Sequence, residues 1–150
     1  MRNFETIEDI IYFAIESEIQ SVEFYNRLSE AAPEGDTKLL FVRLMEEEKS
    51  HIVRLQYLLD HQLENSFPGL SHRFSESDYL PHVTPAPDVD IAEGLIVAIQ
   101  KEKAAIRLYS DLAIDIKKHD LNKFFLLLAS EEEKHYIRFE SEYNALIAKK

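Results

Sequence analysis

The sequence FVRLMEEEKSH at residues 41–51 returns as FLLLASEEEKH at residues 125–135. In each copy Phe, Leu, Glu and His follow one another at helical spacing, so their side chains share one face of a helix. The apolar members assign that face to the core, and a carboxylate and an imidazole lie on it in both copies. These polar core residues are Glu48, His51, Glu132 and His135.

The repeat extends beyond these two stretches and needs no gap. An offset of 84 residues aligns about 11–57 with about 95–141 and places Glu18 on Glu102. Two copies of one helical hairpin should pack about a pseudo-twofold axis, so that matched residues face each other. We therefore expect residues 1–150 to form a single domain built from two related hairpins.

The placement of proline leaves four long helical stretches. The five prolines are Pro33, Pro68, Pro81, Pro85 and Pro87. The stretches without proline carry apolar residues at helical spacing and predict helices over about 6–32, 36–64, 88–117 and from 120 to near the C-terminus. Asp36 and Asp120 are the expected caps of the second and fourth helices.

The links between these helices differ in length. Only a few residues join the first helix to the second and the third to the fourth, which predicts two antiparallel hairpins. Residues 65–87 lack clear periodicity and are numerous enough to span a bundle. The predicted fold class is all-α, a four-helix bundle with one long crossover. In the crossover, Phe67, Phe74 and Tyr79 either cover the bundle or contact another subunit.

Composition excludes several classes of protein. The formal net charge of −11 argues against nucleic acid or an anionic membrane as a partner. The absence of cysteine excludes disulfides, zinc–thiolate sites and a rubredoxin-type iron centre. The N-terminal residues contain no apolar run long enough for a signal peptide or a membrane span. We therefore expect a cytoplasmic protein.

The polar residues on the apolar stripes predict a two-metal site. They are Glu18, Glu48, His51, Glu102, Glu132 and His135. A single Glu-x-x-His usually lies on a solvated helix face, but here two copies lie on apolar stripes, each with a glutamate 30 residues before its own. Burying four unpaired carboxylates together would cost several kcal/mol each. Two divalent cations would cancel the four negative charges.

The types of ligand narrow the choice of metal. Carboxylates and imidazoles without sulfur suit iron or manganese and do not exclude zinc or cobalt. Two adjacent redox metals can exchange two electrons with a bound oxygen species, which favours peroxide or dioxygen chemistry over hydrolysis. We therefore expect two iron ions per chain, with manganese as the alternative and zinc as an ion that purified protein can carry.

At these residues the sequence resembles the ferritin-like di-iron carboxylate superfamily and, within it, the rubrerythrins. The resemblance runs through AIESEIQSVEFY, MEEEKSH, AIQKEKAAIRLY and SEEEKH and covers nearly the whole chain. It implies a ferritin-like bundle with a defined role for each ligand. Glu18 and Glu102 would be the single carboxylates, Glu48 and Glu132 the bridging ones, and His51 and His135 the terminal imidazoles.

Two features depart from the rubrerythrin pattern. Ala105 stands where rubrerythrins have a further glutamate, three residues after the single carboxylate of the third helix. The alanine predicts a more symmetric site. The redox-linked ligand exchange of the rubrerythrins is therefore not carried over to this chain. Without a rubredoxin-like domain, a peroxidase cycle would need an external electron-donor protein.

Two pairs of residues beside the ligands have open roles. Tyr25 and Tyr109 follow the single glutamates by seven residues and match aromatic positions of the family. They are either hydrogen-bond donors to the site or ordinary core tyrosines. Glu47 and Glu131 recur under the repeat and are either solvated or in contact with the ligands.

The resemblance implies a non-haem di-iron oxidoreductase that reacts with hydrogen peroxide or dioxygen, with a role in oxidative stress. The family also implies a homo-oligomer, most simply a dimer. Three alternatives stay open. The chain could oxidise ferrous iron for storage or delivery, bind a protein partner while holding a structural metal, or act as a dimanganese catalase.

Overall fold

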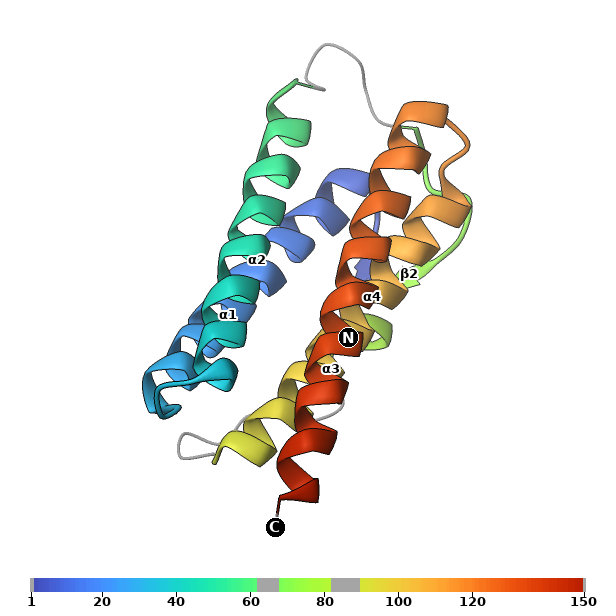
Figure 1. Cartoon of the computed structure of the whole chain (residues 1–150). Helices are drawn as coiled ribbons and strands as arrows, with labels where there is room; N and C mark the ends of the chain where they lie inside the picture. Colours follow the sequence, from blue (N-terminus) through green and yellow to red (C-terminus); the bar gives the residue numbers. More distant parts are fainter. Residues whose placement is uncertain (1, 62–67, 82–89, 150) are drawn as a thin grey trace.

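A computed structural model describes residues 2–61, 68–81 and 90–149. Its long helices are α1 (Ile7–Ala31), α2 (Asp36–His61), α3 (Ile91–Asp115) and α4 (His119–Ala148). Helices α1 and α2 form one antiparallel hairpin, and α3 and α4 form the other (Figure 1). Because α2 and α3 run in the same direction, the chain between them returns along the bundle. The prediction of an all-α four-helix bundle with a long crossover is confirmed.

The 84-residue offset also relates the ends of the helices. Thr6 and Asp90 are the N-caps of α1 and α3, and each accepts a hydrogen bond from the backbone N–H three residues later. Both helices end with a backbone N–H, of Ala32 or Ile116, that donates to a carbonyl four residues earlier. The expected caps Asp36 and Asp120 were both wrong. Asp36 is the first residue of α2, and the preceding Gly35 carbonyl accepts a hydrogen bond from the backbone N–H of Leu39. Asp120 lies in the first turn of α4, and the N-cap is Lys118, whose side chain makes no capping bond.

Two apolar clusters fill the bundle, one at each end. The first includes Ile10, Leu55, Leu112 and Phe125, and the second includes Phe24, Phe41, Leu95 and Phe139. Each fully buried side chain of this size stabilises the fold by about 1.5–3 kcal/mol. On every helix the buried Glu and His residues fall between members of the two clusters. The bundle therefore holds its polar layer between two apolar ones.

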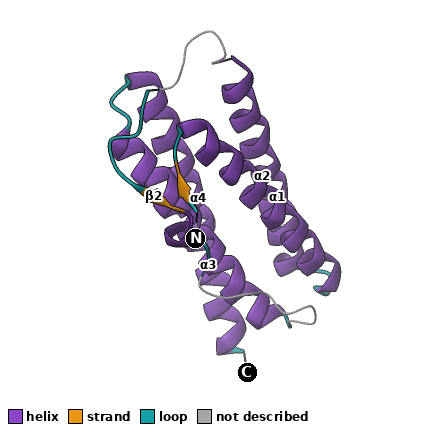
Figure 2. Ribbon diagram, turned by 180° about the vertical axis from the view of Figure 1, so that it is seen from behind, coloured by secondary structure: helices purple, strands orange, loops and turns teal. Residues whose placement is uncertain are grey.

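The described part of the crossover forms a strap over α1 and α3, which we define as residues 70–81. It contains β2 (Phe74–Ser75), paired antiparallel with β1 (Asn3–Phe4), and a short 3-10 helix, η1 (Glu76–Tyr79) (Figure 2). These strands were not predicted, because each is two residues long and their pairing joins segments that are distant in the sequence. Phe74 and Tyr79 are buried and cover the bundle. Phe67 lies outside the described residues.

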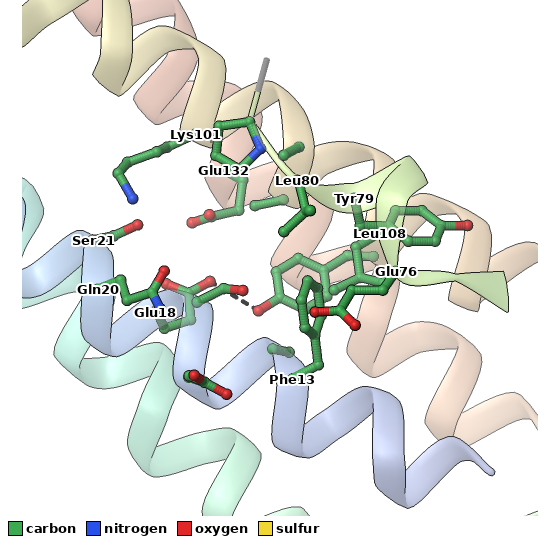
Figure 3. Close-up of a pocket in the computed structure, with 17 residues that line it drawn as sticks. Phe13, Glu18, Gln20, Ser21, Glu76, Tyr79, Leu80, Lys101, Leu108 and Glu132 are labelled. Atoms are coloured by element: carbon green, nitrogen blue, oxygen red, sulfur yellow. Dashed lines mark hydrogen bonds between the residues drawn. The ribbon is translucent and has the colours of Figure 1, made fainter. Parts of the chain in front are cut away.

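Polar contacts fix the strap to α3. The buried carboxylate of Asp115 accepts the backbone N–H of Ser71 at 3.0 Å and pairs with His72 Nδ1. The Tyr79 hydroxyl donates to Asp111 at 2.7 Å. These contacts hold Leu80 and Tyr79 toward the space between α1 and α3 (Figure 3).

Across the described residues, every helix is too short or too polar to cross a membrane.

Candidate metal centre

All six residues predicted as ligands lie together in the polar layer of the bundle. Helix α1 supplies Glu18, α2 supplies Glu48 and His51, α3 supplies Glu102, and α4 supplies Glu132 and His135. None of the six exposes more than 3% of its surface. Every one sits between apolar neighbours at helical spacing, so packing of the apolar stripes brings the polar groups inward. We call these six residues the cluster.

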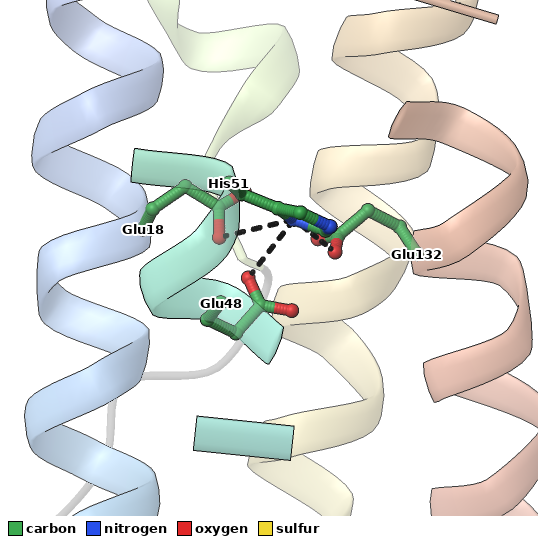
Figure 4. Close-up of side chains that lie close together, drawn as sticks. All are labelled: Glu18, Glu48, His51 and Glu132. Atoms are coloured by element: carbon green, nitrogen blue, oxygen red, sulfur yellow. Dashed lines mark ion pairs between the residues drawn. The ribbon is translucent and has the colours of Figure 1, made fainter. Parts of the chain in front are cut away.

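The cluster divides into two overlapping groups of four. The first contains Glu18, Glu48, His51 and Glu132 (Figure 4), and the second contains Glu48, Glu102, Glu132 and His135. Within each group one ligand atom per residue lies within 4.8 Å of all the others. Glu48 and Glu132 belong to both groups. This arrangement suits two neighbouring cations that share two carboxylates.

The free atoms of the cluster test whether a metal fits. Each of the six residues has one buried side-chain atom without a hydrogen bond of normal geometry, although His51 Nδ1 lies 2.9 Å from Glu132 Oε1 and His135 Nδ1 lies 2.6 Å from Glu48 Oε1. These atoms are Glu18 Oε2, Glu48 Oε1, His51 Nδ1, Glu102 Oε2, Glu132 Oε1 and His135 Nδ1. Buried polar atoms normally have partners, and leaving one unpaired costs about 1–3 kcal/mol. The unpaired atoms fit divalent cations, which prefer oxygen and imidazole donors of this kind.

Tyr25 and Tyr109 are buried, and each donates a hydrogen bond to a glutamate of the other hairpin. The Tyr25 hydroxyl donates to Glu102 Oε1 at 2.7 Å, and the Tyr109 hydroxyl donates to Glu18 Oε1 at 2.8 Å. Each single carboxylate therefore has one oxygen held by a tyrosine and the other free toward the cluster. Burial, followed by the nearby carboxylate charges, raises the pKa of both tyrosines well above 10.0. Of the two roles left open, these tyrosines are hydrogen-bond donors.

Carboxylates also face the outer nitrogens of both imidazoles. His51 Nε2 lies 3.3 Å from Glu131, and His135 Nε2 lies 2.9 Å from Glu47. Such partners fix the ring orientation and tautomer of a metal-binding histidine. The interpretation of Glu47 and Glu131 as solvated residues is therefore incomplete, since both are partly exposed yet contact the cluster.

Glu47 and Glu131, which we call the outer carboxylates, differ in their contacts with arginine. Arg54 donates two hydrogen bonds to Glu131, at 3.0 and 2.7 Å, whereas Arg138 lies 3.9 Å from Glu47. The hydrogen bonds from Arg54 lower the pKa of Glu131 below its usual 4.5. The repeat pairs Arg54 with Arg138 and could have pointed to these residues, but sequence alone does not show that they reach across to the other hairpin.

Protons balance the charge of the cluster when no cation is bound. Burial acts to lower the pKa of His51 and His135, but the close contacts with the buried carboxylates outweigh it and raise the values to about 11 and about 12. Burial acts to raise the pKa of Glu48, but the close contacts with the imidazoles lower it to about 2. Burial and the charge of Glu102 raise the pKa of Glu132 well above 4.5. A metal would displace these protons.

A pocket leads to the cluster between α1 and α3, beneath the strap. This α1–α3 pocket has a volume of about 120 Å³ and reaches Glu18 and Glu132 (Figure 3). Ala105 and Ser21, its counterpart under the repeat, both line the pocket, and neither carries a carboxylate. The seventh carboxylate of rubrerythrins is thus missing from a position beside the cluster. Sequence reasoning did not reveal the pocket.

Solved structures resemble the chain over almost its whole length. A candidate ferritin-like diiron-carboxylate protein from Thermotoga maritima matches with a TM-score of 0.78 and 23% identity, over 96% of this chain and 98% of that one. The chain has a ferritin-like fold. A protein of unknown function from Pyrococcus furiosus matches this ferritin-like chain with a TM-score of 0.74 and 26% identity, over 94% of this chain and 90% of the other.

A third structure shares only the fold. It is a conserved protein of unknown function from Mycobacterium tuberculosis, with a TM-score of 0.68 and 12% identity over 89% of this chain and 94% of that one. Neither a protein-family model nor a curated protein matches the sequence. The ferritin-like fold and the buried cluster together make this chain a candidate metal-binding protein.

Proposed function

We propose that the chain is a rubrerythrin-like non-haem di-iron oxidoreductase that reduces hydrogen peroxide or reacts with dioxygen, with electrons from an external donor protein. One observation carries the proposal: two groups of four buried residues share Glu48 and Glu132, and six of their oxygen and nitrogen atoms converge without a hydrogen bond of normal geometry. The description of the Thermotoga maritima protein as a diiron-carboxylate protein supports the choice of metal.

The residues of the cluster would have different roles in holding two ions. Glu48 and Glu132 would bridge them, and a single carboxylate and an imidazole would complete each position. When bound, two ferrous ions supply the two electrons that reduction of a peroxide requires. Tyr25 and Tyr109 keep the single carboxylates oriented, while the apolar clusters on both sides exclude bulk water.

The surroundings of the cluster suit an oxygen substrate of small size. The α1–α3 pocket gives access to Glu18 and Glu132, whereas ion pairs cover the imidazoles on the α2–α4 side. Reduction of hydrogen peroxide to two waters consumes two protons as well as two electrons. Tyr25 and Tyr109 retain their protons at neutral pH and so preserve their hydrogen bonds to the carboxylates.

Rapid mixing of the di-ferrous protein with hydrogen peroxide tests the proposal. We expect oxidation of both ions at a rate well above that of free ferrous iron. The double variant Glu48→Ala with Glu132→Ala should lose the reaction, whereas Glu46→Ala, on the exposed face of the same helix, should keep it. Oxidation no faster than for free iron would refute the assignment. Faster oxidation by dioxygen than by peroxide would shift it toward a ferroxidase.

A further inference from the structure

We infer that the α1–α3 pocket binds the organic part of a small alkyl hydroperoxide, and that this class of peroxide is the preferred substrate. The inference rests on the proposed peroxide reduction and adds the identity of the substrate. Its basis is the size of the pocket, the apolar character of one end, and the position of the other end at the cluster.

The pocket is larger than hydrogen peroxide requires. Its volume is about 120 Å³, whereas one buried water needs about 10–15 Å³ in the same measure. Hydrogen peroxide has only two heavy atoms and would leave most of this space unfilled. A hydroperoxide with a few carbon atoms would use it.

The two ends of the pocket differ in chemistry. Figure 3 shows Glu18, Ser21 and Lys101 at one end with Glu132, and Leu108, Tyr79 and Phe13 toward the other, with Leu80 between them. The carboxylate of Glu76 also lines the pocket, but it is paired with Arg2 at 3.5 Å. Apolar walls cannot donate or accept hydrogen bonds, so they favour a hydrocarbon group over hydrogen peroxide or water.

This geometry orients a hydroperoxide for reduction. With the alkyl group against Leu80 and Leu108, the O–O group points to the end of the pocket formed by Glu18 and Glu132. Cleavage of the O–O bond would consume two electrons, which a pair of bound ferrous ions would supply, and two protons from solvent. It would release an alcohol and one water.

Small residues on α3 keep the pocket open. Ala104 and Ala105 lie on α3 along the pocket, and a larger side chain there would fill it. Ala105 is only partly buried, so Ala105→Leu should fold. Ala92 is also partly buried on α3 but does not line the pocket, which makes Ala92→Leu a matched control.

Steady-state reduction of a series of peroxides by the iron-loaded protein tests the inference. From methyl to ethyl to propyl hydroperoxide, we expect kcat/KM to rise up to about fourfold for each buried methylene. Ala105→Leu should lower kcat/KM for propyl hydroperoxide about tenfold relative to hydrogen peroxide, and Ala92→Leu should leave that ratio unchanged.

Binding can be measured without turnover. In the zinc-loaded protein, 1-propanol, which is the alcohol product, should shift the NMR signals of backbone amides at residues 101–109 in the parent chain and in Ala92→Leu, but not in Ala105→Leu.

The outcomes separate the two hypotheses. If hydrogen peroxide is reduced without any preference for alkyl hydroperoxides, or if Ala105→Leu slows both equally, the inference on substrate is wrong and the proposed function stands. If no peroxide is reduced faster than by free iron, both are wrong.

Discussion

The two faces of the cluster are built differently. On the α2–α4 face, each imidazole is followed outward by a carboxylate and then an arginine, so charged groups close that side. On the α1–α3 face, small, apolar and a few polar side chains line a pocket that ends at Glu18 and Glu132. One face is suited to holding cations, and the other to admitting a molecule.

The difference follows the internal repeat. Every residue of the α2–α4 face has a counterpart 84 positions away, including the pairs Glu47 with Glu131 and Arg54 with Arg138. The strap, residues 70–81, has no counterpart in the first hairpin. The repeat of one hairpin thus accounts for the six residues of the cluster, while the strap covers the pocket. The comparison can be tested by changing one face at a time.

The largest effect is expected from metal and pH together. His51 and His135 have folded pKa values of about 11 and about 12, above their usual 6.5. The stability they contribute is full below pH 6.5 and is lost as the pH rises through the folded values. The raised pKa values of Glu102 and Glu132 act in the same direction. The metal-free protein should therefore become less stable from about pH 7 to about pH 9.

Bound metal should reverse this trend, because it requires neutral imidazoles and competes better with protons at high pH. At a free metal concentration of about 1,000 times Kd, the gain is about 4 kcal/mol. Thermal unfolding with and without zinc at both pH values measures it. A gap in Tm that narrows as the pH rises would contradict the account.

The outer carboxylates of the α2–α4 face should contribute the next largest effect. Glu131→Gln and Glu47→Gln should each weaken metal binding by about 10–100-fold, because an imidazole loses the partner that fixes its orientation. Titration with cobalt, followed by its absorption spectrum, measures the affinity. Glu46→Gln on the same helix as Glu47 is the control. Unchanged affinity in both outer variants would show that this face does not support the ligands.

Loosening the strap should affect the α1–α3 face and leave the α2–α4 face unchanged. In Asp115→Asn a buried carboxylate that holds Ser71 and His72 becomes a neutral amide, which should cost about 1–3 kcal/mol of stability. Hydrogen exchange at residues 70–81 should become faster, and metal affinity should stay the same. Asp120→Asn, at an exposed position of α4, is the control. A parallel loss of metal affinity would mean that the two faces are not independent.

The smallest effect should come from the tyrosines that cross between the hairpins. Tyr25→Phe and Tyr109→Phe each remove one hydrogen bond to a buried carboxylate and should cost about 1 kcal/mol. The pseudo-twofold arrangement predicts similar costs for both, measured by denaturant unfolding. Costs that differ by more than about twofold would show that the two halves of the cluster are not equivalent.

Sequence could predict the parts of this molecule that depend on local periodicity. The position of Glu48 and His51 on an apolar stripe fixes the face they occupy, and the repeat then fixes the facing residues of the other hairpin. The bounds of the helices followed from the same pattern to within a few residues. Asp120 was misassigned because a residue that can cap a helix is also common in its first turn.

The remaining features depend on contacts between distant segments. No local pattern relates Phe4 to Phe74, which pair as β-strand residues. The same is true of Asp115, whose carboxylate binds Ser71 and His72. The α1–α3 pocket is a space between helices and strap, so no single stretch encodes it. The contact of Arg54 with Glu131 also requires the spacing of two hairpins.

The central claim is that the cluster holds two metal ions, and metal content per chain tests it most directly. We predict about two ions per chain after loading with ferrous iron and removal of excess metal. The double variant Glu48→Ala with Glu132→Ala should fall to near zero, while Glu46→Ala keeps the parent content. A parent chain that retains no metal, or a double variant that retains as much as the parent, would contradict the account.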